Sequence, residues 1–211
     1  MTTMHQQIID ILQQEYPEVI GTELRYKDPW QLLVATILSA QTTDKLVNTV
    51  TKTLFKKYHR LEDYADASLE ELQGELNSIN FYRNKSKYIK RSAQMIRDEY
   101  KGRVPDEMDE LVKLPGVSRK TANVVLSNVY DKHEGVVVDT HVMRLSQRLG
   151  LTGEKTREKI ELDLMEKFPR EQWFNLSNLL ITHGRRVCKA RKPAHDECAA
   201  REYCPSYEQT T

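Results

Sequence analysis

Residues 111–126 read LVKLPGVSRKTANVVL, and the fold assignment starts from this stretch. A short apolar segment ends at Leu114, Pro115-Gly116 supplies a turn, and a second helix with an apolar face follows. The pattern predicts a helix-hairpin-helix. Glycine lets the backbone approach another group closely, and the first N–H groups of the second helix are unpaired and partially positive. The turn therefore suits a phosphate group, although a plain turn between two packed helices would use the same Pro-Gly.

The rest of the chain also predicts helices. Apolar residues recur at steps of three and four through the first half, and capping signals stand at Asp28-Pro29, Thr43-Asp44 and Ser68 with Glu71. The one strand-like run, residues 136–138, is three valines long, which is too short for a sheet and favours a linker. The expected fold class is therefore all-α.

Composition excludes several classes of protein. With 39% hydrophobic and 30% charged residues, the chain of 211 residues is expected to be globular rather than disordered. A net charge of +1 gives no argument for nucleic acid, so a DNA-binding face has to come from the distribution of charge. The polar start of the chain lacks a signal peptide and no run is long enough for a membrane span, so we expect a cytoplasmic protein with no membrane partner.

Two charged residues carry candidate chemistry. Lys120 falls in the first turn of the second hairpin helix, where the helix dipole and Arg119 disfavour an ammonium and favour a nucleophilic amine. Such an amine can attack C1′ of a deoxyribose, and the reaction also needs a carboxylate to stabilise positive charge on the sugar. Asp139 supplies one directly after the valine run, although an Asp before a helix is also an ordinary N-cap.

Taken together, these motifs resemble the endonuclease III family of helix-hairpin-helix DNA glycosylases. The likeness is carried by Lys-Thr-Ala-Asn-Val-Val-Leu, by Val-Asp-Thr-His-Val and by Arg-Leu-Gly-Leu, and it runs through most of the chain. It implies a bifunctional DNA glycosylase and abasic-site (AP) lyase that removes oxidised pyrimidines in base excision repair. Lys120 would form the Schiff base that leads to β-elimination, and Asp139 would be its catalytic partner. Ser118 departs from the family's usual second glycine.

The same resemblance implies the domain organisation. We expect a central helical domain over residues 21–135 that contains the hairpin. A second helical domain would combine residues 1–20 with 136–211 and would carry a metal-cluster loop at 188–204. The partner would be double-stranded DNA with damaged bases or abasic sites, bound by a monomer.

An enzyme that acts on C1′ must take the nucleotide out of the stack and fill the gap with side chains. By resemblance Gln41 would probe the helix with His141 nearby, and Phe81 would be the wedge, after Asn80 in place of the family's Gly. The alternatives are a polar helix end for Gln41 and a core aromatic for Phe81. Positive clusters follow the wedge at residues 83–91 and surround Cys188, although a solvated helix face also explains the first. The remaining candidate DNA contacts are Leu114, Gly116, Ser118, Lys189 and Arg191.

All three cysteines lie close together near the C-terminus, which suits metal ligation better than a disulfide framework. With His195 they form the pattern Cys-x6-His-x2-Cys-x5-Cys, made by Cys188, His195, Cys198 and Cys204. In the family four cysteines hold a 4Fe-4S cluster, so the resemblance implies that cluster with His195 as an unusual fourth ligand. A Cys3His set also suits zinc, and a site without metal is the third alternative.

Two other functions fit parts of the sequence. A relative specialised for mismatched thymine or another base would differ only in its base pocket. A DNA-binding scaffold that has lost catalysis is the alternative from another class, and Lys120 speaks against it.

Overall fold

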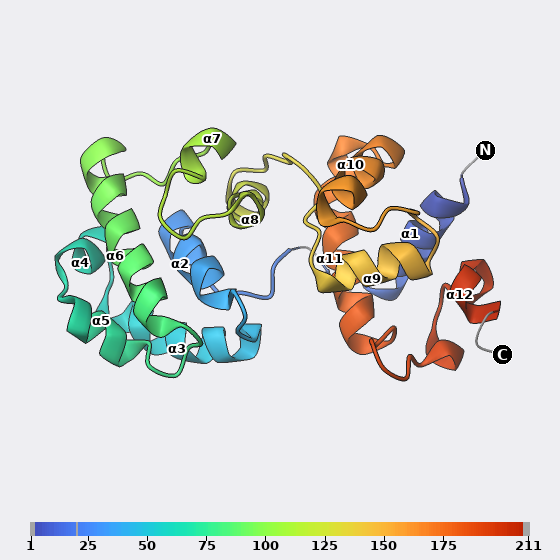
Figure 1. Cartoon of the computed structure of the whole chain (residues 1–211), viewed down its shortest axis with the longest axis horizontal. Coiled ribbons are helices and arrows are strands. Elements are labelled where there is room, and N and C mark those ends of the chain that lie inside the picture. The colour runs from blue at the N-terminus through green and yellow to red at the C-terminus, as the bar shows by residue number, and fades with distance from the viewer. Residues whose placement is uncertain (1–2, 20, 209–211) are drawn as a thin grey trace. The chain divides into compact units, whose positions relative to one another are not determined.

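The computed structural model describes residues 3–19 and 21–208, and within these ranges the chain forms helices and no strand (Figure 1). The all-α prediction is confirmed. Residues 136–138 form a connection, and Val136 and Val138 are buried there. Among the described helices, none has the length and apolar character that crossing a membrane requires.

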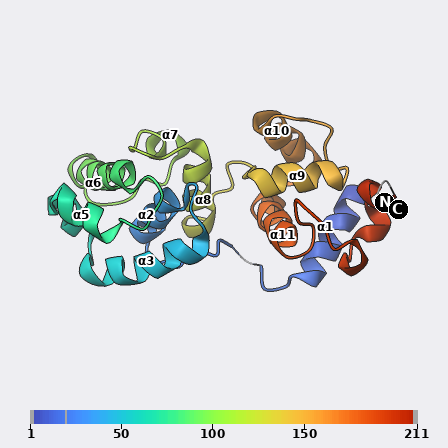
Figure 2. The same cartoon turned by 60° about the horizontal axis from the view of Figure 1, so that its bottom comes forward.

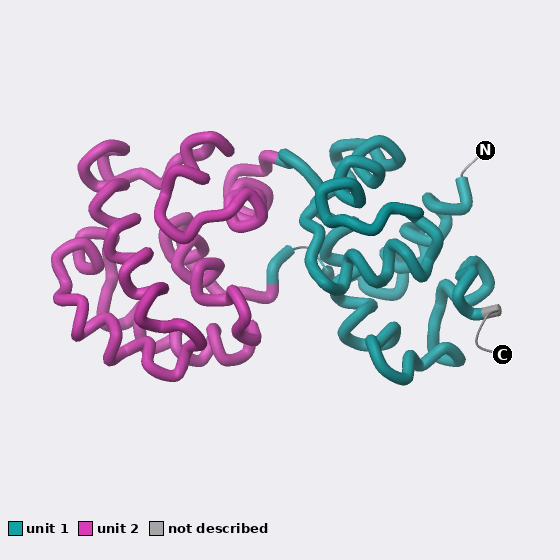
Figure 3. The backbone as a smooth tube through the Cα atoms, viewed as in Figure 1, with its two compact units in different colours: residues 1–22, 133–211 teal, residues 23–132 magenta. Residues whose placement is uncertain are grey.

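The chain divides into two compact units (Figure 3). Unit 1 combines residues 1–22 with 133–211, and unit 2 is residues 23–132. The helices of unit 2 are α2 (Pro29–Ser39), α3 (Asp44–Lys57), α4 (Leu61–Asp66), α5 (Leu69–Glu75), α6 (Tyr82–Glu99), α7 (Met108–Leu111) and α8 (Arg119–Val129). Those of unit 1 are α1 (Met4–Glu15), α9 (Thr140–Arg148), α10 (Arg157–Lys167), η1 (Arg170–Gln172), α11 (Trp173–Arg186), η2 (His195–Glu197), η3 (Arg201–Tyr203) and α12 (Pro205–Glu208).

Unit 2 is built around α2. Every residue from Trp30 to Leu38 is buried, because α3, α6 and α8 pack against different sides of this helix (Figure 2). A helix that is apolar on all sides belongs inside a core. The segments on either side of α2 are therefore held by the best-packed element of the unit.

Side-chain caps set the helix starts that the sequence predicts. The Asp28 carboxylate accepts a hydrogen bond from the Gln31 N–H at 2.8 Å, and Pro29 opens α2. Thr43 caps α3, and Ser68 forms the expected capping box with Glu71. Each such cap stabilises a helix by about 0.5–2 kcal/mol.

In unit 1, α11 packs against α1 and α9. The core between them includes Leu12 from α1, Leu145 from α9 and Leu180 from α11, all fully buried. The first helix of the chain therefore completes the core of its last third, which ties together segments far apart in the sequence.

The hairpin between α7 and α8 depends on one glycine. Gly116 has φ +79°, and a Cβ atom there would lie 2.8 Å from the Tyr88 ring and 2.9 Å from the Tyr88 Cβ. The Ser92 hydroxyl donates to the Pro115 carbonyl oxygen at 3.0 Å, which fastens the turn to α6. Both the backbone angle and the close approach to α6 exclude a side chain at this position.

We predict that Gly116→Ala lowers the stability of unit 2 by about 1–3 kcal/mol, because the new methyl group clashes with Tyr88 and the backbone angle is strained. Urea unfolding followed by circular dichroism measures the change. The control is Gly74→Ala in α5, where a Cβ would meet nothing within 4 Å, and it should be neutral or stabilising by up to about 1 kcal/mol. Equal unfolding midpoints for the two variants would contradict the role of Gly116.

Candidate active site and metal loop

The start of α8 offers unpaired donors beside an exposed lysine. Ser118 caps the helix, its hydroxyl accepting from the Thr121 N–H at 3.2 Å. Its φ of −84° means that serine in place of the family's glycine causes no strain. The backbone N–H groups of Gly116, Ser118 and Lys120 find no acceptor within the part of the chain that is described. Together with the helix dipole, they form a site suited to an anion next to the exposed Lys120 side chain.

Leu114 differs from the other candidate DNA contacts of the hairpin, because its side chain does not reach the surface. Its side chain is buried in the core of unit 2. Any contact of Leu114 with DNA would therefore have to come from its backbone.

Asp139 is the N-cap of α9, one of the two roles that the sequence left open. Its Oδ1 accepts from the backbone N–H groups of His141 at 2.8 Å and Val142 at 2.9 Å, so it is an N-cap. Its Oδ2 has no partner among the described residues, and the side chain is half-buried. One oxygen thus fixes the carboxylate while the other stays available. Asp139 belongs to unit 1 and Lys120 to unit 2.

His141 lies between charged side chains and the backbone of α11. The Arg144 Nη2 is 3.2 Å from the His141 Nδ1, and it donates to the carbonyl oxygens of Gly184 at 3.1 Å and Cys188 at 3.0 Å. Burial, followed by the charges of Arg144 and Arg185, lowers the pKa of His141, while Asp139 raises it. Gly184 of α11 makes room for this pair, because a Cβ there would lie 2.9 Å from each of the two nitrogens.

Gln41 and Phe81 share an unusual backbone. Gln41 has φ 55° and Phe81 has φ 59°, in the left-handed region that such residues rarely adopt. The Phe81 side chain is 63% exposed, so the alternative of a core aromatic is wrong. Strain of about 1–3 kcal/mol at each residue persists only where surrounding contacts impose it.

Asn80 and Lys85 hold this conformation, a role that the sequence did not assign to either of them. Asn80 donates from Nδ2 to the Gln41 carbonyl oxygen at 2.6 Å, which joins the two loops. Lys85 donates from Nζ to the carbonyl oxygens of Leu38 at 2.8 Å and Ala40 at 2.6 Å, and it lies 3.2 Å from the Thr42 hydroxyl. Asparagine at position 80, where the family usually has glycine, thus joins the loop of Phe81 to the loop of Gln41. We call Gln41, Asn80, Phe81 and Lys85 the insertion platform.

The interpretation of residues 83–91 as a solvated basic face is partly wrong. Lys85 is only 4% exposed. Burial lowers the pKa of its ammonium to about 8, so it is still mostly charged at neutral pH. Lys90 likewise donates to the carbonyl oxygens of Ala65 and Ala67. The remaining cations of residues 83–91 are exposed; they are Arg83, Lys87 and Arg91. Lys189 and Arg191, near the cysteines, are exposed as well.

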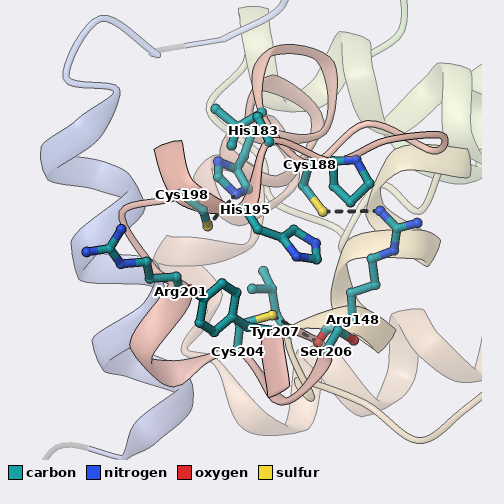
Figure 4. Close-up of a pocket in the computed structure, with 13 residues that line it drawn as sticks. Arg148, His183, Cys188, His195, Cys198, Arg201, Cys204, Ser206 and Tyr207 are labelled. Atoms are coloured by element: carbon teal, nitrogen blue, oxygen red, sulfur yellow. Dashed lines mark hydrogen bonds between the residues drawn. The ribbon is translucent and has the colours of Figure 1, made fainter. Parts of the chain in front are cut away.

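The four predicted metal ligands, Cys188, His195, Cys198 and Cys204, line one pocket in unit 1 (Figure 4). The three cysteines are free thiols. In residues 3–19 and 21–208, however, no group of three or more His, Cys, Asp or Glu has the spacing of a formed metal site. The donors converge without forming a coordination sphere.

The walls of this pocket are held by Arg148 and a buried histidine. Arg148 donates to the Cys188 Sγ at 3.4 Å and to the Lys189 carbonyl oxygen at 2.8 Å. His183 is fully buried, with Nδ1 2.8 Å from the Tyr16 hydroxyl and Nε2 3.4 Å from the Cys198 Sγ. Burial lowers the pKa of His183 to about 4, so the ring is neutral. Neither residue belongs to the cysteine spacing, so the sequence pattern does not place either of them in this pocket.

Comparisons with known proteins agree with this geometry. The family model described as HhH-GPD superfamily base excision DNA repair protein matches residues 34–170. Endonuclease III of Synechocystis sp. is 48% identical over 200 residues, 95% of this chain and 91% of that protein. Endonuclease III of Bacillus subtilis is 50% identical over 183 residues, 86% of this chain and 83% of that protein. The chain belongs to the endonuclease III family.

Solved structures extend the agreement to three dimensions. A trapped covalent intermediate of endonuclease III with DNA superimposes with a TM-score of 0.91 and 41% identity, over 100% of this chain and 99% of that chain. A thermostable thymine-DNA glycosylase superimposes with a TM-score of 0.84 at 21% identity, a likeness of fold alone. As a member of the endonuclease III family, the protein is a DNA glycosylase and AP lyase of base excision repair.

We predict that Lys85→Met destabilises unit 2 by about 1–3 kcal/mol, because the carbonyl groups of Leu38 and Ala40 lose their buried donor. Urea unfolding measures the loss. Lys87→Met, on the exposed side of the same helix, is the control and should unfold like the wild type. If both variants unfold at the wild-type urea concentration, Lys85 does not hold the platform.

We predict that Arg185→Gln raises the pKa of His141, because removing a positive charge favours the imidazolium, and that Asp139→Asn lowers it further. A pH titration of the imidazole C–H signals by NMR measures both. Lys155→Gln, which removes the same charge from an exposed site on another loop, should leave the titration unchanged. Shifts of the opposite sign would show that these charges do not face the ring.

Proposed function

We propose that this enzyme removes oxidised pyrimidines from double-stranded DNA and cleaves the strand through Lys120, with Asp139 as its catalytic partner. The observation that carries the proposal is the place of Lys120. Its side chain is exposed one turn from a set of unpaired backbone N–H groups suited to a DNA phosphate. A bound phosphate there would bring the neighbouring sugar to the amine.

The reaction follows from an amine and a carboxylate. The deprotonated Lys120 Nζ forms a bond to C1′, the glycosidic bond breaks, and the base leaves with its electron pair and takes up a proton. The sugar ring then opens as one amine proton passes to O4′, which gives the protonated Schiff base between Nζ and C1′. Removal of a C2′ proton then expels the 3′ phosphate by β-elimination. The free oxygen of Asp139 would stabilise positive charge on the sugar and move these protons.

A related structure supports the covalent step. The protein in the 41% identical match is described as a trapped covalent intermediate of endonuclease III with DNA. Lys120 is the nucleophile that we assign to the same step here, because it is the lysine at the start of the hairpin helix.

The insertion platform would open the duplex. Phe81 is a large exposed wedge that can separate and stack on bases, and Gln41 beside it would fill the vacated position. The half-buried imidazole of His141 would offer a further hydrogen-bonding group. The hairpin backbone at Leu114, Gly116 and Ser118 would bind a phosphate, and the exposed Lys189 and Arg191 would bind others.

The C-terminal loop is proposed to hold a 4Fe-4S cluster through Cys188, His195, Cys198 and Cys204. The donor types fit, since thiolates and imidazole both ligate iron–sulfur centres. Their convergence on one pocket beside the cationic Arg148 and Arg201 also fits an anionic cluster. When bound, the cluster would supply structure, closing the loop that displays Lys189 and Arg191.

The mechanism predicts that borohydride traps the enzyme on a duplex containing thymine glycol or an abasic site, and that Lys120→Ala abolishes the adduct. Denaturing gel electrophoresis measures the trapped complex. Lys113→Ala is the matched control, because Lys113 lies on the same hairpin and its ammonium pairs with Glu110 at 2.7 Å. Undiminished trapping with Lys120→Ala would overturn the mechanism, and no trapping with the wild type would favour a DNA-binding scaffold.

The variant Asp139→Asn distinguishes the role of Asp139 as an N-cap of α9 from its proposed catalytic role. Asparagine is as good an N-cap as aspartate, so the variant should fold and bind DNA like the wild type. The rate of base release should fall by about 10²–10⁴, the usual contribution of a catalytic acid or base. An unchanged rate of base release would show that Asp139 acts only as an N-cap.

For the cofactor, we predict that protein purified without oxygen contains about four iron and four sulfide per chain and absorbs visible light. His195→Ala should lose the metal, whereas His195→Cys should retain it. His59→Ala, an exposed histidine of unit 2, is the control and should keep the full content. A colourless protein with one zinc per chain would overturn the choice of metal.

A further inference from the structure

A second pocket in unit 2 carries concentrated positive charge. It has a volume of about 330 Å³ and lies between the segment before α2 and the side of α3. Four cations line it, and no carboxylate does; the cations are Arg25, Lys27, Lys52 and Lys56. We call it the basic pocket.

The positive charge of the basic pocket is not neutralised by the protein. None of the four cationic side chains makes a hydrogen bond or ion pair with a described residue. By contrast Lys57, adjacent to Lys56 in sequence but outside the pocket, pairs with Glu75 at 2.7 Å. Cations that face one cavity without a partner attract an anion.

The walls of the pocket are fixed before any ligand arrives. Asn48 of α3 accepts from the Arg25 N–H at 2.8 Å and donates to the Glu23 carbonyl oxygen at 2.9 Å, which fastens the segment before α2 to α3. The Tyr26 hydroxyl donates to the Asn128 carbonyl oxygen at 3.2 Å. Because these segments are already fixed, ligand binding loses little free energy to ordering of the pocket walls.

The amide of Gln31 also lines the cavity. Gln31 is 7% exposed, and its Oε1 accepts from the Lys27 N–H at 3.0 Å. Because a backbone N–H only donates, the amide oxygen must face it, and the amide nitrogen is left over. This NH2 group has no acceptor in residues 3–19 and 21–208, and it is open to the cavity. It can therefore donate to a ligand that occupies the cavity.

The apolar part of the lining comes from two aromatic rings, Tyr26 and Phe55, both half-buried. Cations with a neutral donor suit a phosphate, and flat apolar rings suit a nucleobase. We propose that the basic pocket binds a nucleotide, its phosphate on the cations and Gln31 and its base against Tyr26 or Phe55. The phosphate comes either from a free nucleotide or from a nucleotide within a strand.

The basic pocket is separate from the insertion platform. It lies at the start of α2, whereas Gln41 follows the end of this 11-residue helix, a length of about 16 Å. Occupation of the pocket therefore need not compete with insertion of Gln41 into DNA.

Calorimetric titration of the full chain with thymidine 5′-monophosphate tests the proposal, with thymidine as the probe that lacks phosphate. We expect the monophosphate to bind at least about tenfold more tightly than thymidine, and Lys52→Glu/Lys56→Glu to weaken it at least about tenfold. The control Lys155→Glu/Lys159→Glu makes the same charge change at exposed sites of unit 1 and should bind like the wild type.

A short oligothymidylate distinguishes the two sources of phosphate. Tighter binding of the oligonucleotide, weakened by the pocket variant, identifies a strand as the ligand, and tighter binding of the monophosphate identifies a free nucleotide. Borohydride trapping by the pocket variant should equal that of the wild type. The proposal is overturned if neither probe binds, or if the pocket variant and the control weaken binding equally.

Discussion

The ammonium of Lys85 holds together the part of the molecule that would enter DNA. It reaches from α6 to the end of α2, where it occupies carbonyl oxygens that the helix leaves without partners. Around this contact the loop turns through Gln41 in a strained conformation, and Asn80 fixes the loop to the neighbouring Phe81. Removing the ammonium would free each of these groups, so the exposed wedge depends on a buried charge.

Among the candidate catalytic groups, single residues would serve both the fold and the proposed chemistry. Asp139 caps α9 with one oxygen, and its other oxygen has no partner among the described residues. Ser118 caps α8 in the turn that leaves backbone donors exposed beside Lys120. Positions at helix starts are suited to this double use, because the unpaired N–H groups there stabilise carboxylates and bind phosphates equally.

The metal loop and the basic pocket show how charge is distributed in a chain of nearly zero net charge. Near the C-terminus, Arg148 ties together the backbone and one thiol of the loop that contains the cysteines. At the start of α2, four cations face one cavity without carboxylates. Elsewhere the ammonium groups of lysines bind backbone carbonyl oxygens, as that of Lys90 does at the end of α4. The unpaired cations of the basic pocket thus differ from lysines such as Lys90, whose ammonium is paired within the fold.

Periodicity, caps and spacing were enough to predict an all-α fold, the hairpin and the start of α2, because these depend on neighbours in sequence. The family came from the resemblance of short motifs to those of known enzymes. The sequence did not reveal that Lys85 is buried while Lys87 is exposed, since both look alike in a basic run. It also missed His183 beside Cys198 and the cavity around Gln31. Burial and unpaired donors depend on which distant helices pack together, and only the tertiary structure decides that.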